Sequence, residues 1–154
     1  MDPLLPPITG QETAIDPSRP LGALADFYAA FNGRDLVRMQ AHWAGGEDIA
    51  MSNPLGGIKR GWSEIREVYA RIFSGPATVR VDFHDYTLHQ EGGLLYAVGR
   101  ERGEFHRDTT VLALAIRTSR IFRREEGRWR QVHHHGSIED PALLKAYQEA
   151  VRRP

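Results

Sequence analysis

The stretch Trp129-Arg130-Gln131-Val132-His133-His134-His135-Gly136-Ser137 has the composition of a β-strand and holds three of the chain's seven histidines. Side chains of a strand point alternately to its two faces. Strict alternation gives one face that is aromatic at its start and polar and titratable at its end, as the wall of a pocket would be. That face carries Trp129, Gln131, His133, His135 and Ser137, and the opposite face carries Arg130, Val132 and His134.

Three more β segments come before this stretch, and short turns join all four. Residues 78–89, 94–105 and 109–124 have strand patterns, and glycine-containing turns at 92–93 and 125–127 separate them. Consecutive strands joined this tightly form an antiparallel meander. A strand as long as 109–124 usually bends or bulges, so its faces are assigned only to within one register.

The first half of the chain has helical periodicity instead. Apolar residues recur every three or four positions over residues 20–32, 35–44 and 61–74, and a short strand at 48–53 interrupts these helices. Asp140 is a suitable cap for a final helix. Three early helices must cover one face of the sheet that follows them. The pattern therefore predicts an α+β fold with a conical cavity between helices and sheet.

Length and composition indicate one globular domain. We expect residues 1–19, with four prolines, to form an extended arm that is either disordered or draped over a neighbouring surface, and residues 20–154 to form the domain. Twenty basic and twenty acidic residues balance, which argues against nucleic-acid and membrane partners. The chain has no cysteine and no signal-peptide pattern, so we expect a cytoplasmic protein without thiol chemistry.

Four local motifs, taken in their order along the chain, also indicate a protein family. They are Tyr28-Ala29-Ala30-Phe31-Asn32 with Asp35-Leu36, Asn53-Pro54-Leu55-Gly56, Gly61-Trp62-Ser63-Glu64-Ile65, and Gly127-Arg128-Trp129 with His133, His135 and Ser137. In this order they resemble the nuclear transport factor two-like superfamily, in its SnoaL-like, ketosteroid-isomerase-related branch. The resemblance implies a cone-shaped α+β barrel, with a strongly bent antiparallel sheet and three N-terminal helices over its concave face. It also implies a homodimer through the outer sheet face.

The same resemblance argues against steroid isomerisation. Isomerases of this family place a carboxylate base in the turn after the first strand, where this chain has Asn53, and an amide cannot take a proton at neutral pH. Their first-helix tyrosine corresponds to Phe27, one residue before Tyr28. The protonated aspartate that completes their oxyanion site falls nearest to Ser119. The base is absent, and at least one of the oxyanion donors is altered.

The predicted catalytic residues are His133, His135 and Arg117. The two histidines would act as acid and base, and Arg117 would bind a carboxylate or enolate oxygen. Each has a plainer interpretation: the histidines could fill the narrow end of the cone, and Arg117 could lie on the surface or pair with Glu101 or Asp82. A His-x-His pair supplies only two metal ligands. Asp82, His84, Glu101 or His106 could supply a third ligand only if the strands bring them close, so a metal-dependent enzyme stays an alternative. Our prediction is no metal and no cofactor.

Aromatic residues dominate the expected lining of the cavity, and such walls favour a small apolar or polycyclic ligand. One hypothesis is a SnoaL-like enzyme that carries out proton transfer on a small apolar carbonyl compound, as an isomerase, cyclase or dehydratase. The alternative is a non-catalytic ligand-binding or dimerisation module, which the missing base at Asn53 favours. The predicted lining residues are Tyr28, Asn53, Trp62, Tyr69, Ser119, Trp129 and Gln131.

Overall fold

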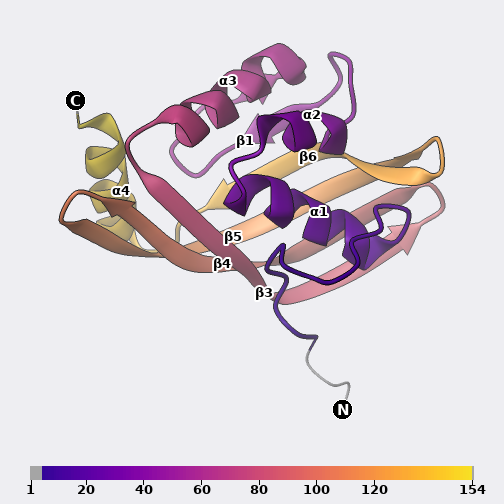
Figure 1. Cartoon of the computed structure of the whole chain (residues 1–154), viewed down its shortest axis with the longest axis horizontal. Helices are drawn as coiled ribbons and strands as arrows, with labels where there is room; N and C mark the ends of the chain where they lie inside the picture. The colour runs from indigo at the N-terminus through magenta and orange to yellow at the C-terminus, as the bar shows by residue number, and fades with distance from the viewer. Residues whose placement is uncertain (1–4, 154) are drawn as a thin grey trace.

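The computed structural model describes residues 5–153, and a single curved, unclosed sheet is its main feature (Figure 1). The strand order is β2-β1-β6-β5-β4-β3, and β3 to β6 form the antiparallel meander expected from the sequence. The short β1 joins β6 in parallel. The strands are β1 (Ala50–Ser52), β2 (Lys59–Arg60), β3 (Thr78–Glu91), β4 (Leu94–Arg107), β5 (Thr110–Glu125) and β6 (Arg128–Ser137).

Three helices lie across one face of this sheet, and a fourth packs at one end (Figure 1). The helices are α1 (Pro20–Asn32), α2 (Leu36–His42), α3 (Gly61–Ser74) and α4 (Pro141–Arg152). The cap predicted at Asp140 is present and Asp35 caps α2 in the same way, since each carboxylate accepts a backbone N–H of the first helical turn. The predicted α+β class, the bent sheet and the three covering helices are all confirmed.

Two glycines of β4 allow the sheet to bend sharply. Gly99 and Gly103 face the helices, and a Cβ on Gly103 would lie only 1.9 Å from the carbonyl oxygen of Arg80 on β3. A Cβ on Gly99 would meet the Phe83 ring at 2.8 Å. The absence of side chains at these positions lets β3 approach β4 and close the cone on this side.

A β-bulge in β6 changes the faces that strict alternation predicts. Ile121 of β5 pairs with His133 and Phe122 pairs with Gln131, so Val132 is an additional residue on β6. Trp129 and Gln131 point inward, as predicted, but after the bulge His134 is the buried residue. The predicted inward orientation of His133 and His135 is therefore wrong.

The described part of the N-terminal arm packs against its own domain. Ile8 is buried and forms an antiparallel bridge to Phe83 of β3, with N···O distances of 2.9 and 3.0 Å. The side-chain amide of Asn32 donates to the carbonyl oxygens of Thr9 and Val81 and so joins the arm, α1 and β3. From residue 5 onward the arm therefore contacts α1 and β3 through residues 8 and 9, and residues 1–4 lie outside the described range.

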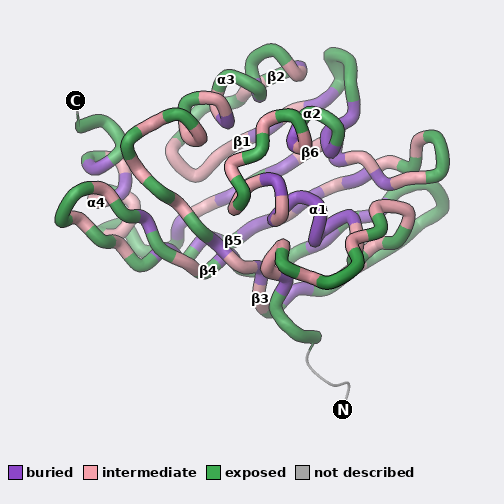
Figure 2. The backbone as a smooth tube through the Cα atoms, in the orientation of Figure 1, coloured by how far each residue is buried: buried purple, intermediate pink, exposed green. Residues whose placement is uncertain are grey.

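Burial is concentrated where the helices meet the concave face of the sheet. Figure 2 shows buried backbone along α1 and alternating along the central strands, with exposed segments on the outer turns and on α3. No helix within residues 5–153 is long and apolar enough to cross a bilayer.

Candidate functional site

A cavity of about 250 Å³ lies between the concave face of the sheet and the helices α1, α3 and α4. Most of its wall is apolar, and Phe27, Ile116 and Tyr147 are representative lining residues. Two buried charged or titratable groups from neighbouring strands interrupt this wall: the ion pair of Glu101 with Arg120 and the imidazole of His134 are both part of the lining. The cavity has the composition of a small-molecule site, which is mostly apolar with a few convergent polar groups.

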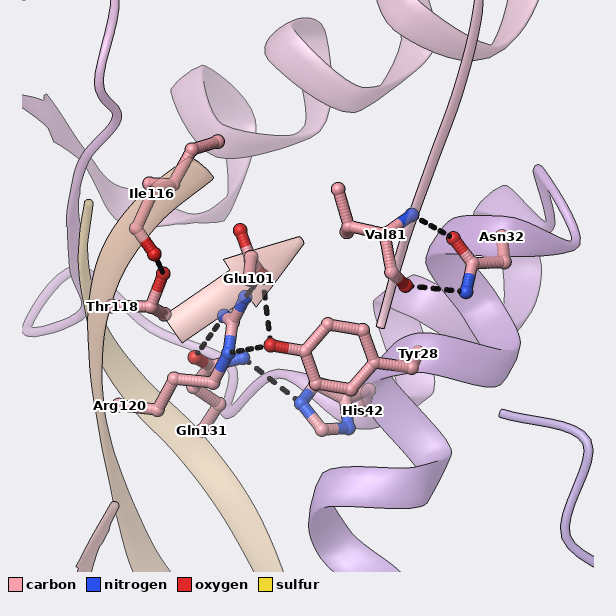
Figure 3. Close-up of polar contacts among 9 residues, drawn as sticks. All are labelled: Tyr28, Asn32, His42, Val81, Glu101, Ile116, Thr118, Arg120 and Gln131. Atoms are coloured by element: carbon pink, nitrogen blue, oxygen red, sulfur yellow. Dashed lines mark hydrogen bonds and ion pairs between the residues drawn. The ribbon is translucent and has the colours of Figure 1, made fainter. Parts of the chain in front are cut away.

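Arg120 is the central polar group of the cavity (Figure 3). Its Nη2 donates to Glu101 Oε2 at 2.8 Å, its Nη1 donates to Gln131 Oε1 at 2.8 Å, and its Nε donates to the Tyr28 hydroxyl at 3.4 Å. The Tyr28 hydroxyl in turn donates to Glu101 Oε2 at 2.8 Å. The guanidinium also lies 3.5 Å from the centroid of the Phe27 ring.

These contacts leave donors and an acceptor for a ligand. A guanidinium has five N–H groups, and three of those of Arg120 make the contacts above, while the other two have no hydrogen-bond partner in the described part of the chain. Glu101 Oε1 likewise has no partner among residues 5–153. The arrangement offers a fixed positive donor and a carboxylate oxygen at an apolar surface.

His134 is buried, and neither of its ring nitrogens has a hydrogen-bond partner among the described residues. Burial lowers the pKa of this imidazole well below 6.5, and the positive charge of Arg120 lowers it further. A neutral imidazole has one N–H donor and one nitrogen that can accept a proton. His134 therefore has one donor and one acceptor that no other described residue satisfies, and its ring is part of the cavity lining.

Six of the seven predicted lining residues fall into three groups, and the seventh, Ser119, lies on the outer face. Asn53 and Tyr69 lie on the wall of the cavity, and Asn53 Oδ1 accepts the Leu55 backbone N–H at 2.9 Å, as in an Asx turn. Tyr28 and Gln131 are buried behind the wall, where they hold Arg120. The two tryptophans are not on the wall: Trp129 is fully buried, and Trp62 packs against the edge of the core.

The predicted catalytic residues lie on the other side of the sheet. Arg117, Ser119 and His135 border a shallow groove on the outer face, and Arg117 forms an exposed ion pair with Glu139 at 3.3 Å. His133 is half-buried, with its Nδ1 3.0 Å from the carbonyl oxygen of Ala50. Their placement in the cavity, like that of Ser119, is wrong because the bulge and the register of β5 direct them outward. A catalytic role for them stays a prediction.

Sequence reasoning missed Glu101, Arg120 and His134. For Arg120 a signal was present in the alternation along β5. Arg120 lies an even number of residues from the apolar Leu114, Ile116 and Phe122, so it points to the same, buried face of the strand. Glu101 likewise shares the inward face of β4 with Leu95 and Phe105. His134 had no such signal, since its face depends on the extra residue in β6.

The described residues contain no group of three or more histidine or acidic side chains that could hold a metal ion. On the concave side, the buried charged or titratable residues that line the apolar cavity supply one carboxylate, one guanidinium and one neutral imidazole. Asn53 and two less buried cations, Lys59 and Arg71, also line it.

A bent sheet covered by three helices around an apolar cavity defines the class of cone-shaped α+β proteins. Residues 21–141 match the profile of the SnoaL-like domain family, and the chain belongs to this family. No curated protein matches the chain.

Solved structures share the fold. A candidate calcium/calmodulin-dependent protein kinase type II association domain from Thiobacillus denitrificans is 25% identical, with a TM-score of 0.68 over 79% of this chain and 95% of that one. A candidate dehydratase of the NTF2-like family from Streptomyces avermitilis is 18% identical, with a TM-score of 0.69 over 75% and 89%. A ketosteroid isomerase-like protein from Erwinia carotovora is 18% identical, with a TM-score of 0.63 over 77% and 92%.

Proposed function

We propose that the protein is a proton-transfer enzyme, of the isomerase, cyclase or dehydratase type, that acts on a small and largely apolar carbonyl compound. The observation that carries this proposal is the buried His134, which lines an apolar cavity and whose two ring nitrogens have no hydrogen-bond partner among residues 5–153. Buried polar groups are normally hydrogen-bonded. An exception in a cavity is best accounted for by a ligand that supplies the missing partners.

In the proposed reaction, the unprotonated nitrogen of His134 takes a proton from the carbon next to the carbonyl group. The electron pair of that C–H bond moves into the enolate, and the negative charge develops on the carbonyl oxygen. The free N–H groups of Arg120 stabilise this oxygen, because fixed donors act strongly where water is excluded. The imidazolium of His134 then returns a proton to the enolate.

The size of the cavity limits the substrate. Its volume of about 250 Å³ lies below the range of about 300–1,000 Å³ that is typical of sites for drug-sized ligands. A compound with one or two rings, or an acyclic compound of similar size, fits such a cavity. The apolar wall binds the body of the compound, and Arg120 binds its oxygen.

The proposal is tested by hydrogen exchange into a model ketone. β-Tetralone is a bicyclic ketone with acidic α-hydrogens, and NMR follows their replacement by deuterium in D₂O. We expect the protein to accelerate this exchange, and His134→Gln to reduce the acceleration by about 100-fold or more, since Gln cannot take a proton. The matched control is His135→Gln on the outer face, which should exchange like the wild type.

A second candidate function is a non-catalytic ligand-binding module. It is favoured by Asn53, which stands where the family's isomerases have their base and whose amide oxygen is engaged in its own turn. Saturable binding of β-tetralone without faster exchange would support this module and overturn the enzyme. Equal exchange by wild type and His134→Gln would also overturn the proposed role of His134.

We also propose that two copies of the chain associate through the outer face of the sheet. Three large exposed apolar side chains follow one another on outward positions at the start of β4, namely Leu94, Tyr96 and Val98. A symmetric dimer would cover the same patch on both copies.

A further inference from the structure

A chain of buried polar side chains runs from the side of α1 to the cavity. Asp26 of α1 and His42 of α2 are 2.9 Å apart, from Oδ2 to Nδ1. The other ring nitrogen of His42, Nε2, is 2.9 Å from Gln131 Nε2 of β6, and Gln131 Oε1 accepts from Arg120 (Figure 3). Neither Asp26 nor His42 is part of the cavity lining. The hydrogen bonds therefore connect Asp26 and His42 to Arg120, which does line the cavity.

The donor and acceptor roles along this chain are fixed. An ionised carboxylate only accepts, so His42 Nδ1 must carry the proton that faces Asp26. In the neutral imidazole the other nitrogen, Nε2, is then an acceptor, and it receives an N–H of the Gln131 amide. That orientation presents the amide oxygen of Gln131 to Arg120, which can only donate. The ionised Asp26 thus determines the tautomer of His42, and that tautomer determines the orientation of the Gln131 amide.

Other contacts fix the charge states of Asp26 and His42 and the position of the His42 ring. The hydrogen bonds from His42 and Arg38 outweigh the effect of burial and lower the pKa of Asp26, so its carboxyl group is ionised. Arg38 Nε binds the other carboxylate oxygen at 2.9 Å. Burial lowers the pKa of His42, so its imidazole is neutral. The ring packs against Phe27 and Phe122, with centroids 5.5 and 5.7 Å away, and cannot easily reorient.

We infer that Asp26 and His42 are positioning residues, which fix the Gln131 amide and thereby hold Arg120 in the orientation that binds the substrate oxygen. The inference rests on the proposed function for its catalytic consequence. The orientation itself is a property of the protein alone and can be measured without a substrate.

The change that tests it is Asp26→Asn. An asparagine can turn its oxygen to Arg38 and its NH₂ group to His42, which favours the tautomer with the proton on Nε2. Gln131 must then offer its oxygen to His42, and its NH₂ group meets the N–H of Arg120. Two donors face each other, and Arg120 has to move.

Two measurements follow this change. Two-bond ¹H–¹⁵N NMR correlations report the tautomer of His42, and we expect the Nδ1–H form in the wild type and the Nε2–H form in Asp26→Asn.

In β-tetralone exchange, kcat of Asp26→Asn should fall about 10- to 100-fold, because a small misplacement of a catalytic donor has this effect. The KM should stay within about twofold, since the apolar wall is unchanged. Glu67→Gln is the matched control: it is an acid-to-amide change at an exposed position of α3, outside this network, and should preserve both tautomer and kcat.

A second pair of variants keeps the inference testable if Asp26→Asn does not fold. His42→Gln can still donate to Asp26 and accept from Gln131, so it should retain exchange activity, whereas His42→Leu has no polar atom and should lose it. An unchanged tautomer in Asp26→Asn, an unchanged kcat despite a changed tautomer, or equal activity of His42→Leu and His42→Gln overturns the positioning role alone. A wild type without exchange overturns the proposed function, while the tautomers still show whether Asp26 sets the orientation.

Discussion

His134 couples the stability of the fold to pH. Its pKa lies well below 6.5 in the folded chain because of burial, whereas in the unfolded chain it is about 6.5. The unfolded state therefore binds a proton first as the pH falls. The stability that the neutral imidazole confers is fully present above pH 6.5, and it is lost as the pH falls towards the folded-state pKa. His42, whose pKa is also lowered by burial, acts in the same direction.

We therefore expect the free energy of unfolding to decrease from pH 7 to pH 5, by at most about 1.4 kcal/mol per pH unit for each of the two histidines. His134→Gln should flatten this dependence, and His135→Gln on the exposed outer face should not. Urea denaturation at several pH values measures both curves. Parallel curves for wild type and His134→Gln would show that His134 is not buried in its neutral form.

The proposed function gives the buried Glu101–Arg120 pair a role that its effect on stability does not. Buried ion pairs lose much of their attraction to the loss of hydration, and apolar residues of similar size often stabilise a core as well or better. This chain nevertheless places a guanidinium in its cavity and surrounds it with Tyr28, Gln131 and the Phe27 ring. A preorganised donor in an apolar cavity is what stabilisation of a developing oxyanion requires.

At the level of helices and strands, much of the fold could be predicted from the sequence. Proline, glycine and aspartate mark the helix ends, and the change of apolar period from helical to alternating marks the meander. The bulge at Val132 could not be predicted, because the run from Val132 to His135 is compatible with either register. Its presence depends on pairing with β5 and β1, which is a tertiary contact. One inserted residue moves the candidate site from His133 and His135 to His134.

The N-terminal arm stabilises the free edge of the sheet. Ile8 is 5% exposed and pairs with Phe83 on β3, the edge strand, while Leu5 is 47% exposed. We expect Ile8→Ala to decrease the free energy of unfolding by about 2–4 kcal/mol, because it removes a buried side chain and leaves a cavity. Leu5→Ala is the matched control and should have little effect. Urea denaturation measures the difference, and equal values for the two variants would mean that the arm is not packed in solution.

The whole molecule has two chemically different faces. The concave face holds the cavity, and the convex face carries exposed apolar residues of β4 and β5 beside ionic side chains such as Arg100 and Asp85. A patch of this kind on one side of a sheet is typical of an interaction surface. Because β4 and β5 contribute to both faces, association on the convex side would also brace the strands that carry Glu101 and Arg120.

The proposed association is tested by a charge on the convex face. Val98 lies opposite Ser119 on the outer side of β4 and is 43% exposed. In a two-fold dimer each substitution occurs twice, so Val98→Lys should weaken association by about 100-fold, the effect of roughly 1.4 kcal/mol at each of two sites. Val37→Lys on α2, at a position 82% exposed, is the matched control. Sedimentation velocity should give twice the 17.4 kDa chain mass for wild type and Val37→Lys, and the monomer mass for Val98→Lys. A monomeric wild type would contradict the proposed dimer. A dimer that persists in Val98→Lys would show that its interface lies elsewhere.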